Sequence, residues 1–517
     1  MHEPKYDLKP IIAPRLSGWP LVAAANLVEW VPGLAYFLGK DSGLFDLKKV
    51  KVDTIPTYYP FDQETYSLLV SNASKPLSAK ETVDILTKGF HPNGFTASVD
   101  YVALYKSGKV TPVDLMTKML DYIEEDEAKD VGVKALLKYA REDIMKQAQA
   151  SKIRYQSGKP LGPLDGVPIA VKDEMNALPY NTNVGTVCID IRPEEDAVIV
   201  QRLREAGAII IGKAAMHELG FDVTNCNPFV RTPRNPYNLN HWTGGSSGGS
   251  GAIVASGVCP ISLGADGGGS IRIPAAYNGI YGLKPTAARL PGAGAYPLAP
   301  SVGVVGPLAS NAHDLALAYY LTAGPNKMEN NTLLQPLKSI ASFGNVANLN
   351  GVKIGVYYPY FDDADPEIVQ QCKKALEDYV ELGAKLVPIT IPNLQNLRNA
   401  HSTLGMNYLR DIFQEVDVIV TPTTGITSPE IPKGALEYGL TDYSTSGEAM
   451  KYIFLANLLG IPAVSCPIGY SSKGMPIGIQ FQARWWNEDL LLRLANANDC
   501  TQSSKFKKPS NYFSILE

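Results

Sequence analysis

The chain has 517 residues, of which 45% are hydrophobic, with 47 basic and 51 acidic side chains and a formal net charge of −4. The length suits one large domain or a few average ones, and the charge is balanced, without the basic runs that follow nucleic-acid phosphates. We therefore expect a globular protein with no nucleic-acid partner.

The cysteines are widely scattered, with no Cys-x-x-Cys pair and no histidine at zinc-finger spacing: Cys188, Cys226, Cys259, Cys372, Cys466 and Cys500. This spacing predicts neither a structural metal site nor a disulfide framework, and it favours a reducing compartment. Residues 1–10 mix both charges with two prolines, which is not the pattern of a secretory signal peptide. The sequence thus favours an intracellular location.

The most apolar early stretch is residues 18–39, GWPLVAAANLVEWVPGLAYFLG. It is about long enough to cross a bilayer, but it carries Glu29 and is interrupted by Pro20 and Pro32, so we do not expect it to span one. Two interpretations stay open. Short helices could place aromatic side chains in a membrane interface, or a hairpin could cover the protein's own core. The aromatic residues concerned are Trp19, Trp30, Tyr36 and Phe37.

Regular structure is expected from about Thr111 onwards. Residues 60–100 are rich in Pro, Asn, Ser and Gly and predict an irregular connection. Thr111, Pro112 and Asp114 then supply an N-cap, a first-turn proline and an acidic first turn. Apolar residues follow at helical spacing and predict an amphipathic helix: Leu115, Met119, Leu120 and Ile123.

Further along, short apolar strands alternate with helices. Residues 166–173 predict a buried strand that ends in Lys172, and residues 196–214 predict a helix, a glycine stop and a strand. The same alternation continues through residues 351–358, 366–384, 417–423 and 476–483. This pattern predicts an α/β fold, with one large domain and the first 60 or so residues as an appendage.

Residues 244–286 concentrate glycine, holding twelve of the 45 glycines with serines among them. No Gly-Lys pair is followed by Ser or Thr, and no G-x-G-x-x-G opens a helix here, so we do not expect a phosphate loop. A serine nucleophile would need a base. His217 and His241 lie closest in sequence, and a histidine partner for Ser246 is one alternative.

A lysine base is the other alternative. Lysine accepts a proton only when neutral, and burial at the end of the strand PIAVK would lower the pKa of Lys172. The run DGGGSIR lets backbone N–H groups converge on an oxyanion, with Ser270 placed to attack the same carbonyl. A hydroxyl both donates and accepts, so Ser246 could relay a proton. From these residues alone, a second interpretation stays open, in which the glycines serve only close packing and Lys172 points into water.

Two segments resemble a known family. Residues 244–275, GGSSGGSGAIVASGVCPISLGADGGGSIRIPA, resemble the signature of the amidase signature family, and residues 162–174, GPLDGVPIAVKDE, resemble its lysine strand. The resemblance runs from about residue 95 to about residue 500. It implies a large, central, mixed and twisted β-sheet with helices on both faces, and it implies neither a metal nor a cofactor.

The resemblance also implies roles for individual residues. Ser270 would be the nucleophile, Ser246 the bridging serine after a cis peptide bond, and Lys172 the base. Ser247 would support this network by hydrogen bonding. The oxyanion hole would consist of the backbone N–H groups of Gly267, Gly268, Gly269 and Ser270.

Within the family, GKAAMHELG (212–220), DVIVTPTTGIT (417–427) and LANLLGIPAVSCPIGY (455–470) are similar to plant-type fatty acid amide hydrolases. This implies a serine amidase that forms an acyl-enzyme and cleaves lipid amides such as N-acylethanolamines to fatty acid and amine. It further implies a hydrophobic helical cap at residues 1–60, a catalytic domain at residues 61–517, a homodimer, and a peripheral position on an intracellular membrane, or else a cytoplasmic one.

The chain departs from that subgroup near Gly405. Between residues 397–405 and residues 408–422, plant-type members carry several dozen more residues, including helices beside the acyl pocket. Two alternatives therefore stay beside the lipid assignment. One is a small-amide or glutamine amidase of the amidotransferase A-subunit type. The other is a catalytically impaired, membrane-associated relative.

Overall fold

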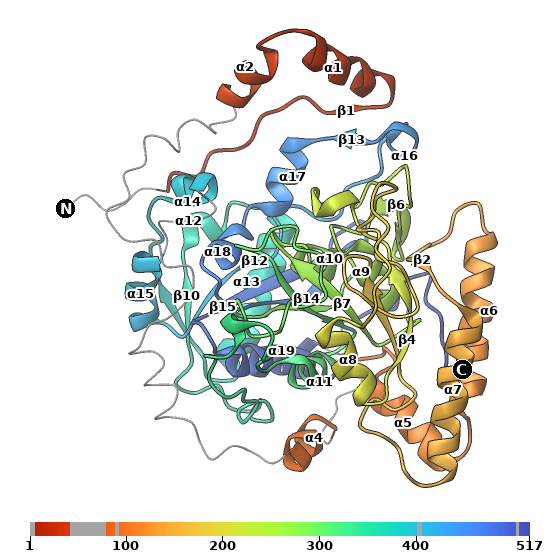
Figure 1. The fold of residues 1–517 in the computed structure, drawn as a ribbon. Coiled ribbons are helices and arrows are strands. Elements are labelled where there is room, and N and C mark those ends of the chain that lie inside the picture. The colour runs from red at the N-terminus through yellow and green to blue at the C-terminus, as the bar shows by residue number, and fades with distance from the viewer. Residues whose placement is uncertain (1–5, 42–78, 88–92, 401–405, 503–505, 517) are drawn as a thin grey trace.

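A single sheet of eleven strands runs through the middle of the computed structural model (Figure 1). The structure describes residues 6–41, 79–87, 93–400, 406–502 and 506–516. In sheet order the strands are β11 (Lys385–Pro388), β10 (Lys353–Val356), β12 (Val418–Pro422), β15 (Pro476–Ala483), β14 (Ala463–Tyr470), β8 (Tyr281–Lys284), β9 (Val304–Ala309), β7 (Ile261–Asp266), β3 (Pro168–Lys172), β4 (Ile209–Ala214) and β2 (Leu136–Lys138).

The sheet is mixed, as expected. β3 runs parallel to both β4 and β7, and β10 runs parallel to β11 and β12, whereas the central strands from β15 to β9 pair antiparallel. β3, β4 and β7 are buried along their whole length, which explains their continuous apolar runs. The α/β fold class is confirmed.

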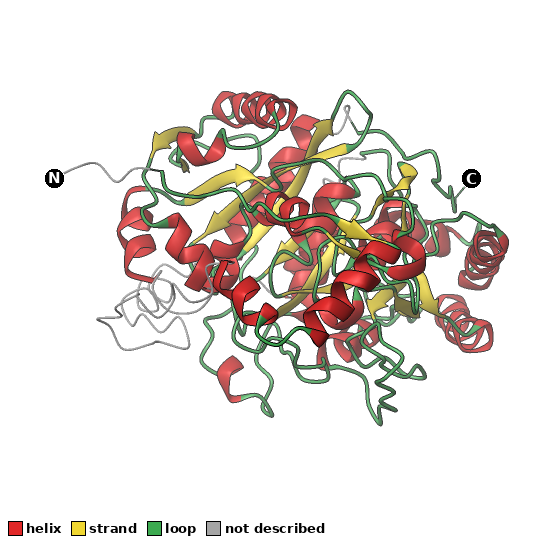
Figure 2. Cartoon of the chain, turned by 90° about the horizontal axis from the view of Figure 1, so that it is seen from above, coloured by secondary structure: helices red, strands yellow, loops and turns green. Residues whose placement is uncertain are grey.

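Helices lie on both sides of this sheet (Figure 2). The longer ones in the body of the protein are α4 (Ala79–Thr87), α5 (Ser98–Ser107), α6 (Pro112–Ala128), α7 (Arg141–Gln156), α8 (Val198–Glu205), α9 (Gly248–Ala255), α11 (Ala312–Thr322), α13 (Pro366–Glu381), α15 (Met406–Glu415), α17 (Tyr443–Met450) and α19 (Glu488–Gln502). The shorter ones are α10 (Arg272–Tyr277), α12 (Tyr358–Phe361), α14 (Leu394–Ala400), α16 (Ala435–Tyr438) and α18 (Phe454–Leu458).

Local sequence explains where these elements begin. The start of α6 is the predicted capping box: the Asp114 N–H donates to Thr111 Oγ1 (3.3 Å), and the Thr111 N–H donates to the Asp114 carboxylate (2.9 Å). The expectation of an irregular connection over residues 60–100 is wrong where α4 and the start of α5 lie. α5 begins at Ser98 because the Asp100 carboxylate accepts from the Ala97 N–H (2.8 Å) and closes the first turn.

The N-terminal segment lies at one edge of the molecule, where α1 (Trp19–Trp30) and α2 (Leu34–Asp41) sit over β13 and α17 (Figure 1). β1 (Leu16–Ser17) pairs with β13 (Leu440–Thr441). No residue of α1 is buried, and Trp19 and Trp30 are 68% and 74% exposed. Among the helices that the structure describes, none is long and apolar enough to cross a membrane. The rest of the expected cap, residues 42–60, lies outside the described residues.

Candidate active site

Lys172, the last residue of β3, is 1% exposed and points into the protein. Its Nζ lies 2.9 Å from Ser246 Oγ, 3.3 Å from the Ala265 carbonyl oxygen and 3.2 Å from Glu174 Oε2. The alternative in which Lys172 points into water is therefore wrong. β3 carries Lys172 to this position between its parallel neighbours β4 and β7, and Ala265 comes from β7 itself.

Burial lowers the pKa of Lys172, although the nearby carboxylates of Glu174 and Asp266 oppose that shift. The net direction is downward from the ordinary value of 10.5. Because a lysine base must be neutral, this environment moves the side chain toward the form that accepts a proton.

Ser246 lies in the turn between β6 (Asn238–Trp242) and α9, and the Gly245–Ser246 peptide bond is cis. The Ser246 carbonyl accepts a hydrogen bond from the His217 N–H (3.1 Å). A Cβ on Gly245 would lie 2.7 Å from the Asp222 carbonyl oxygen, so only glycine fits this close approach of two backbones. The turn thereby holds the Ser246 hydroxyl against the lysine amine.

Ser270 follows the glycine turn at the end of β7 and stands just before α10. The Ser247 N–H donates to the Ser270 carbonyl (3.2 Å), and the Ser247 hydroxyl donates to the Ala265 carbonyl (3.2 Å). These bonds fasten the Ser246–Ser247 turn to both sides of the glycine turn. Lys172, Ser246, Ser247 and Ser270 therefore share one buried site, and Ser270 is 7% exposed.

The glycine turn presents backbone donors. Within the described structure, the N–H groups of Gly267, Gly268 and Ser270 donate to no protein acceptor. The Gly269 N–H differs, because it donates to Asp266 Oδ1 (2.7 Å). Of the four groups expected to form an oxyanion hole, three are thus unengaged and one is committed to the protein.

A buried ion pair anchors this turn, and sequence reasoning missed it. Arg272 donates through Nε to Asp266 Oδ2 and through Nη2 to Oδ1, both at 3.0 Å, and Asn457 Nδ2 also donates to Oδ1 (2.9 Å). Burial alone would raise the pKa of Asp266, but the charge and hydrogen bonds of Arg272 and Asn457 hold it well below its ordinary value. The sequence did carry a signal for this ion pair. In DGGGSIR the oppositely charged Asp266 and Arg272 stand at the two ends of a short run whose neighbours are mostly apolar.

The histidines that sequence reasoning considered bond to backbone carbonyls. His241 Nδ1 lies 2.7 Å from the Ser428 carbonyl oxygen, and His217 Nδ1 lies 3.3 Å from that of Glu218. Burial lowers the pKa of His217, which favours its neutral form. Within the described residues, the hydrogen-bond partner of the Ser246 hydroxyl is Lys172 rather than a histidine.

Two apolar side chains lie close to backbone glycines of this region. A Cβ on Gly268 would lie 3.1 Å from Met450 Cε, and one on Gly220 would lie 3.2 Å from Leu298 Cδ1 and 3.4 Å from Ser246 Oγ. Met450, at the end of α17, and Leu298 are thus within reach of a group bound at the serines. The buried lysine and serines thus have at least these two apolar side chains nearby.

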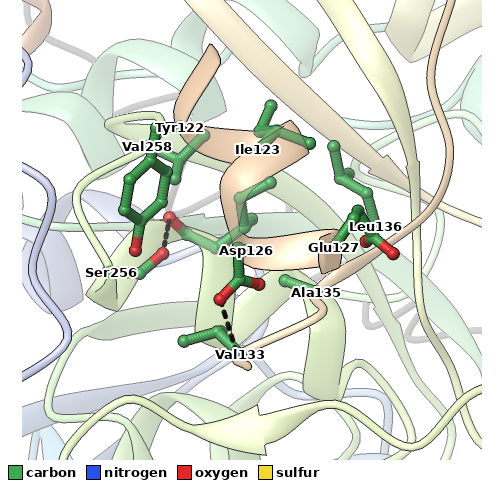
Figure 3. Close-up of a pocket in the computed structure, with 10 residues that line it drawn as sticks. Tyr122, Ile123, Asp126, Glu127, Val133, Ala135, Leu136, Ser256 and Val258 are labelled. Carbon is green, nitrogen blue, oxygen red and sulfur yellow. Dashed lines mark hydrogen bonds between the residues drawn. The ribbon is translucent and has the colours of Figure 1, made fainter. Parts of the chain in front are cut away.

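The pocket in Figure 3 is a different place. Residues of α6 and of the end of α9 line it, and its polar groups are used internally, as when Asp126 Oδ1 accepts from the Val133 N–H (3.0 Å) and Ser256 Oγ donates to the Ile253 carbonyl (3.0 Å). None of the site residues lines it. Within the described part of the chain, no group of three or more His, Cys, Asp or Glu side chains is arranged to hold a metal ion.

The amidase family model matches residues 118–406 and 396–492. The chain is 37% identical over 473 residues to the fatty acid amide hydrolase of Oryza sativa subsp. indica, with coverage of 81% of this chain and 78% of the rice protein. It is 32% identical over 591 residues to the fatty acid amide hydrolase of Arabidopsis thaliana, with coverage of 99% and 96%. The structure of the native peptide amidase from Stenotrophomonas maltophilia matches with a TM-score of 0.68 and 24% identity, over 81% of this chain and 99% of that chain, a likeness of fold.

Proposed function

The chain belongs to the amidase signature family and is an amide-hydrolysing enzyme, and on that premise we propose that it works through a Ser270–Ser246–Lys172 triad on fatty acid amides. The observation that carries the proposal is the 2.9 Å contact between Lys172 Nζ and Ser246 Oγ inside a buried site that also holds Ser270.

In the proposed acylation step, neutral Lys172 accepts the proton of the Ser246 hydroxyl while Ser246 accepts the proton of Ser270. The Ser270 oxygen then attacks the substrate carbonyl carbon, and its electron pair becomes the new C–O bond. The negative charge that forms on the carbonyl oxygen is stabilised by the unengaged N–H groups of Gly267, Gly268 and Ser270.

Collapse of this intermediate breaks the C–N bond. An amine leaves poorly unless it is protonated, so the proton held by Lys172 returns through Ser246 to the leaving nitrogen. Water then attacks the acyl-enzyme, giving up one proton along the same route, and releases the carboxylic acid and the Ser270 hydroxyl. The residues of this chain supply each proton transfer without a further cofactor.

The lipid substrate class rests on the relatives and on the surroundings of the site. The similar rice and Arabidopsis proteins are fatty acid amide hydrolases, and the apolar side chains of Met450 and Leu298 lie near Gly268 and Gly220. N-acylethanolamines are the proposed substrates. The exposed aromatic side chains of α1 and α2 suit contact with a membrane surface, where such amides reside. We also propose that residues 1–60 form the membrane-facing cap of a catalytic domain. The proposed oligomeric state is a homodimer, which analytical sedimentation would check.

The shortened segment near Gly405 falls where residues 401–405 lie outside the described residues. The alignment with the Arabidopsis protein is longer than this chain, so that relative has stretches without a counterpart here. The catalytic residues all precede this segment. We therefore expect the shortened segment to affect the choice of substrate rather than the chemical steps.

The test is hydrolysis of a long-chain N-acylethanolamine compared with acetamide and glutamine, with the Ser270→Ala variant beside the wild type. We expect selective turnover of the lipid amide, lost in the variant. Turnover of the small amides alone would contradict the lipid assignment and favour the small-amide alternative. Absence of all turnover in folded protein would favour the impaired relative.

A further inference from the structure

Glu174 lies against the proposed base, yet the mechanism above does not use it. Glu174 is 5% exposed, and its Oε2 lies 3.2 Å from Lys172 Nζ. The chain turns directly after β3, where the Met175 N–H donates to the Lys172 carbonyl (3.1 Å) and the Tyr296 N–H donates to the Glu174 carbonyl (2.8 Å). This turn brings the carboxylate back onto the lysine two residues before it.

Lys172 Nζ has three oxygen neighbours: Ser246 Oγ, the Ala265 carbonyl and Glu174 Oε2. An ammonium has three hydrogens and can donate to all three. A neutral amine has two hydrogens and one lone pair, and only the serine hydroxyl among these neighbours can donate to that lone pair. Donation to Ala265 and Glu174 therefore leaves the lone pair directed at Ser246, as proton transfer from that hydroxyl requires.

We propose that Glu174 is a positioning residue of the amidase reaction, which together with the Ala265 carbonyl holds the Lys172 amine with its lone pair toward Ser246 and pairs with the ammonium once the proton has moved. The inference rests on the proposed function, because it assumes that Lys172 is the base.

Other charged groups near this pair are engaged elsewhere. Asp173 Oδ2 accepts from the Gly185 N–H (3.0 Å), and its Oδ1 lies 3.7 Å from Lys213 Nζ. Asp266 is bound by Arg272. Asp266 from β7 acts on Lys172 and Lys213 from β4 acts on Glu174 through longer-range charge, and His217 after β4, whose pKa burial lowers, faces the charge of Lys172. In the described structure, Glu174 is the carboxylate in direct contact with Lys172.

Two substitutions separate charge from geometry. Glu174→Gln keeps an oxygen that accepts from the amine but removes the negative charge. The ammonium form then loses its partner, so the acid limb of the pH–rate profile should move to lower pH, and the plateau rate should fall about tenfold because the base is weaker. Glu174→Ala removes the acceptor as well, and its plateau rate should fall about 100-fold, within the range for a positioned base. Glu174→Asp should recover part of the rate.

The measurement is the second-order rate at which a fluorophosphonate labels Ser270 from pH 5 to 10, with folding checked by circular dichroism. Glu205→Gln, which removes a carboxylate from the exposed end of α8, is the matched control and should keep the wild-type profile. If Glu174→Gln, folded, shows the wild-type rate and acid limb, the inference is overturned and the triad stands. If folded wild type is not labelled at all, the proposed function fails and the inference with it.

Discussion

At the scale of single residues, the proposed mechanism assigns the role of base to Lys172. Lys172→Ala should slow acylation at pH 7 by about 10²- to 10⁴-fold, the contribution of a positioned general base. The wild-type rate should rise with pH through a single ionisation below the ordinary lysine value of 10.5, because burial lowers the pKa of Lys172 and only the neutral amine accepts a proton. Fluorophosphonate labelling at several pH values checks both, and near-normal rates in the variant would exclude Lys172 as the base.

The glycines of the turn between β7 and Ser270 are not equivalent. Gly269 has a φ of +98°, and a Cβ there would lie 2.6 Å from Ile453 Cγ2, so Gly269→Ala should lower the free energy of unfolding by about 1–3 kcal/mol. At Gly267 the nearest atom to an added Cβ is 3.7 Å away, so Gly267→Ala should change stability by less than about 0.5 kcal/mol. Urea unfolding compares the pair, and equal losses would contradict this account of the turn.

How far the sequence predicts this site depends on how local each interaction is. Lys172, Ser246 and Ser270 stand in two contiguous motifs, so the resemblance of these motifs to the amidase signature predicted them as site residues. Glu174 was missed, because it contacts Lys172 only through the turn that ends β3. Asn457 was missed for a different reason: it lies 191 residues from Asp266 in the chain, and only the fold brings the two together.

At the scale of elements, strands and helices with strong local signals were predicted closely. The strand predicted at residues 476–483 is β15, and the helix predicted at residues 366–384 is α13, which ends at Glu381. Gly383, with a φ of +101°, explains that end, since it turns the chain out of the helix. The pairing of β1 with β13 could not be predicted, because it joins two-residue strands from opposite ends of the chain.

The N-terminal segment is fastened to the body beside the site. Ala13 N–H donates to Ser444 Oγ (2.9 Å), Ser444 Oγ donates to the Ala13 carbonyl (3.1 Å), and Arg15 pairs with Asp442 (3.2 Å). Both partners belong to the start of α17, and the same helix ends at Met450 beside the glycine turn. One helix thus contacts the N-terminal segment at its start and the glycine turn at its end.

This placement makes the membrane proposal testable. Combined Ser substitutions at Trp19, Trp30 and Phe37, which are 65–74% exposed, should reduce co-sedimentation with liposomes, because aromatic rings partition into the lipid interface. Ser substitutions at Phe229 and Leu337, exposed to 72% and 76% outside the hairpin, are the matched control and should leave binding unchanged. Equal binding by both sets would mean that the α1–α2 hairpin is not the contact surface.

At the scale of the whole molecule, two buried carboxylates join distant parts of the chain. Asp499 in α19 accepts from the Ala312 N–H (2.7 Å), the Tyr281 hydroxyl (2.8 Å) and Asn93 Nδ2 (3.2 Å). Asp314 in α11 accepts from the Ser98 N–H (3.0 Å). These bonds connect the segment around Asn93 and Ser98 to strand β8 of the central sheet and to helices α11 and α19.

Burial raises the pKa of Asp499 to about 7 and that of Asp314 to about 6, despite these hydrogen bonds. Between the ordinary value of 3.8 and these raised values, the folded protein binds more protons than the unfolded chain. The free energy of unfolding contributed by each group should therefore fall as pH rises through that window, and level off above it.

Asp499→Asn isolates this effect, because an amide does not titrate. From pH 4 to pH 7 the wild type should lose a few kcal/mol of unfolding free energy relative to the variant. The size follows from about 1.4 kcal/mol for each unit by which folding raises the pKa. Urea unfolding at each pH provides the measurement, with Asp362→Asn on the exposed surface as the control. A difference that stays constant with pH would show that Asp499 is ionised in the folded protein at low pH.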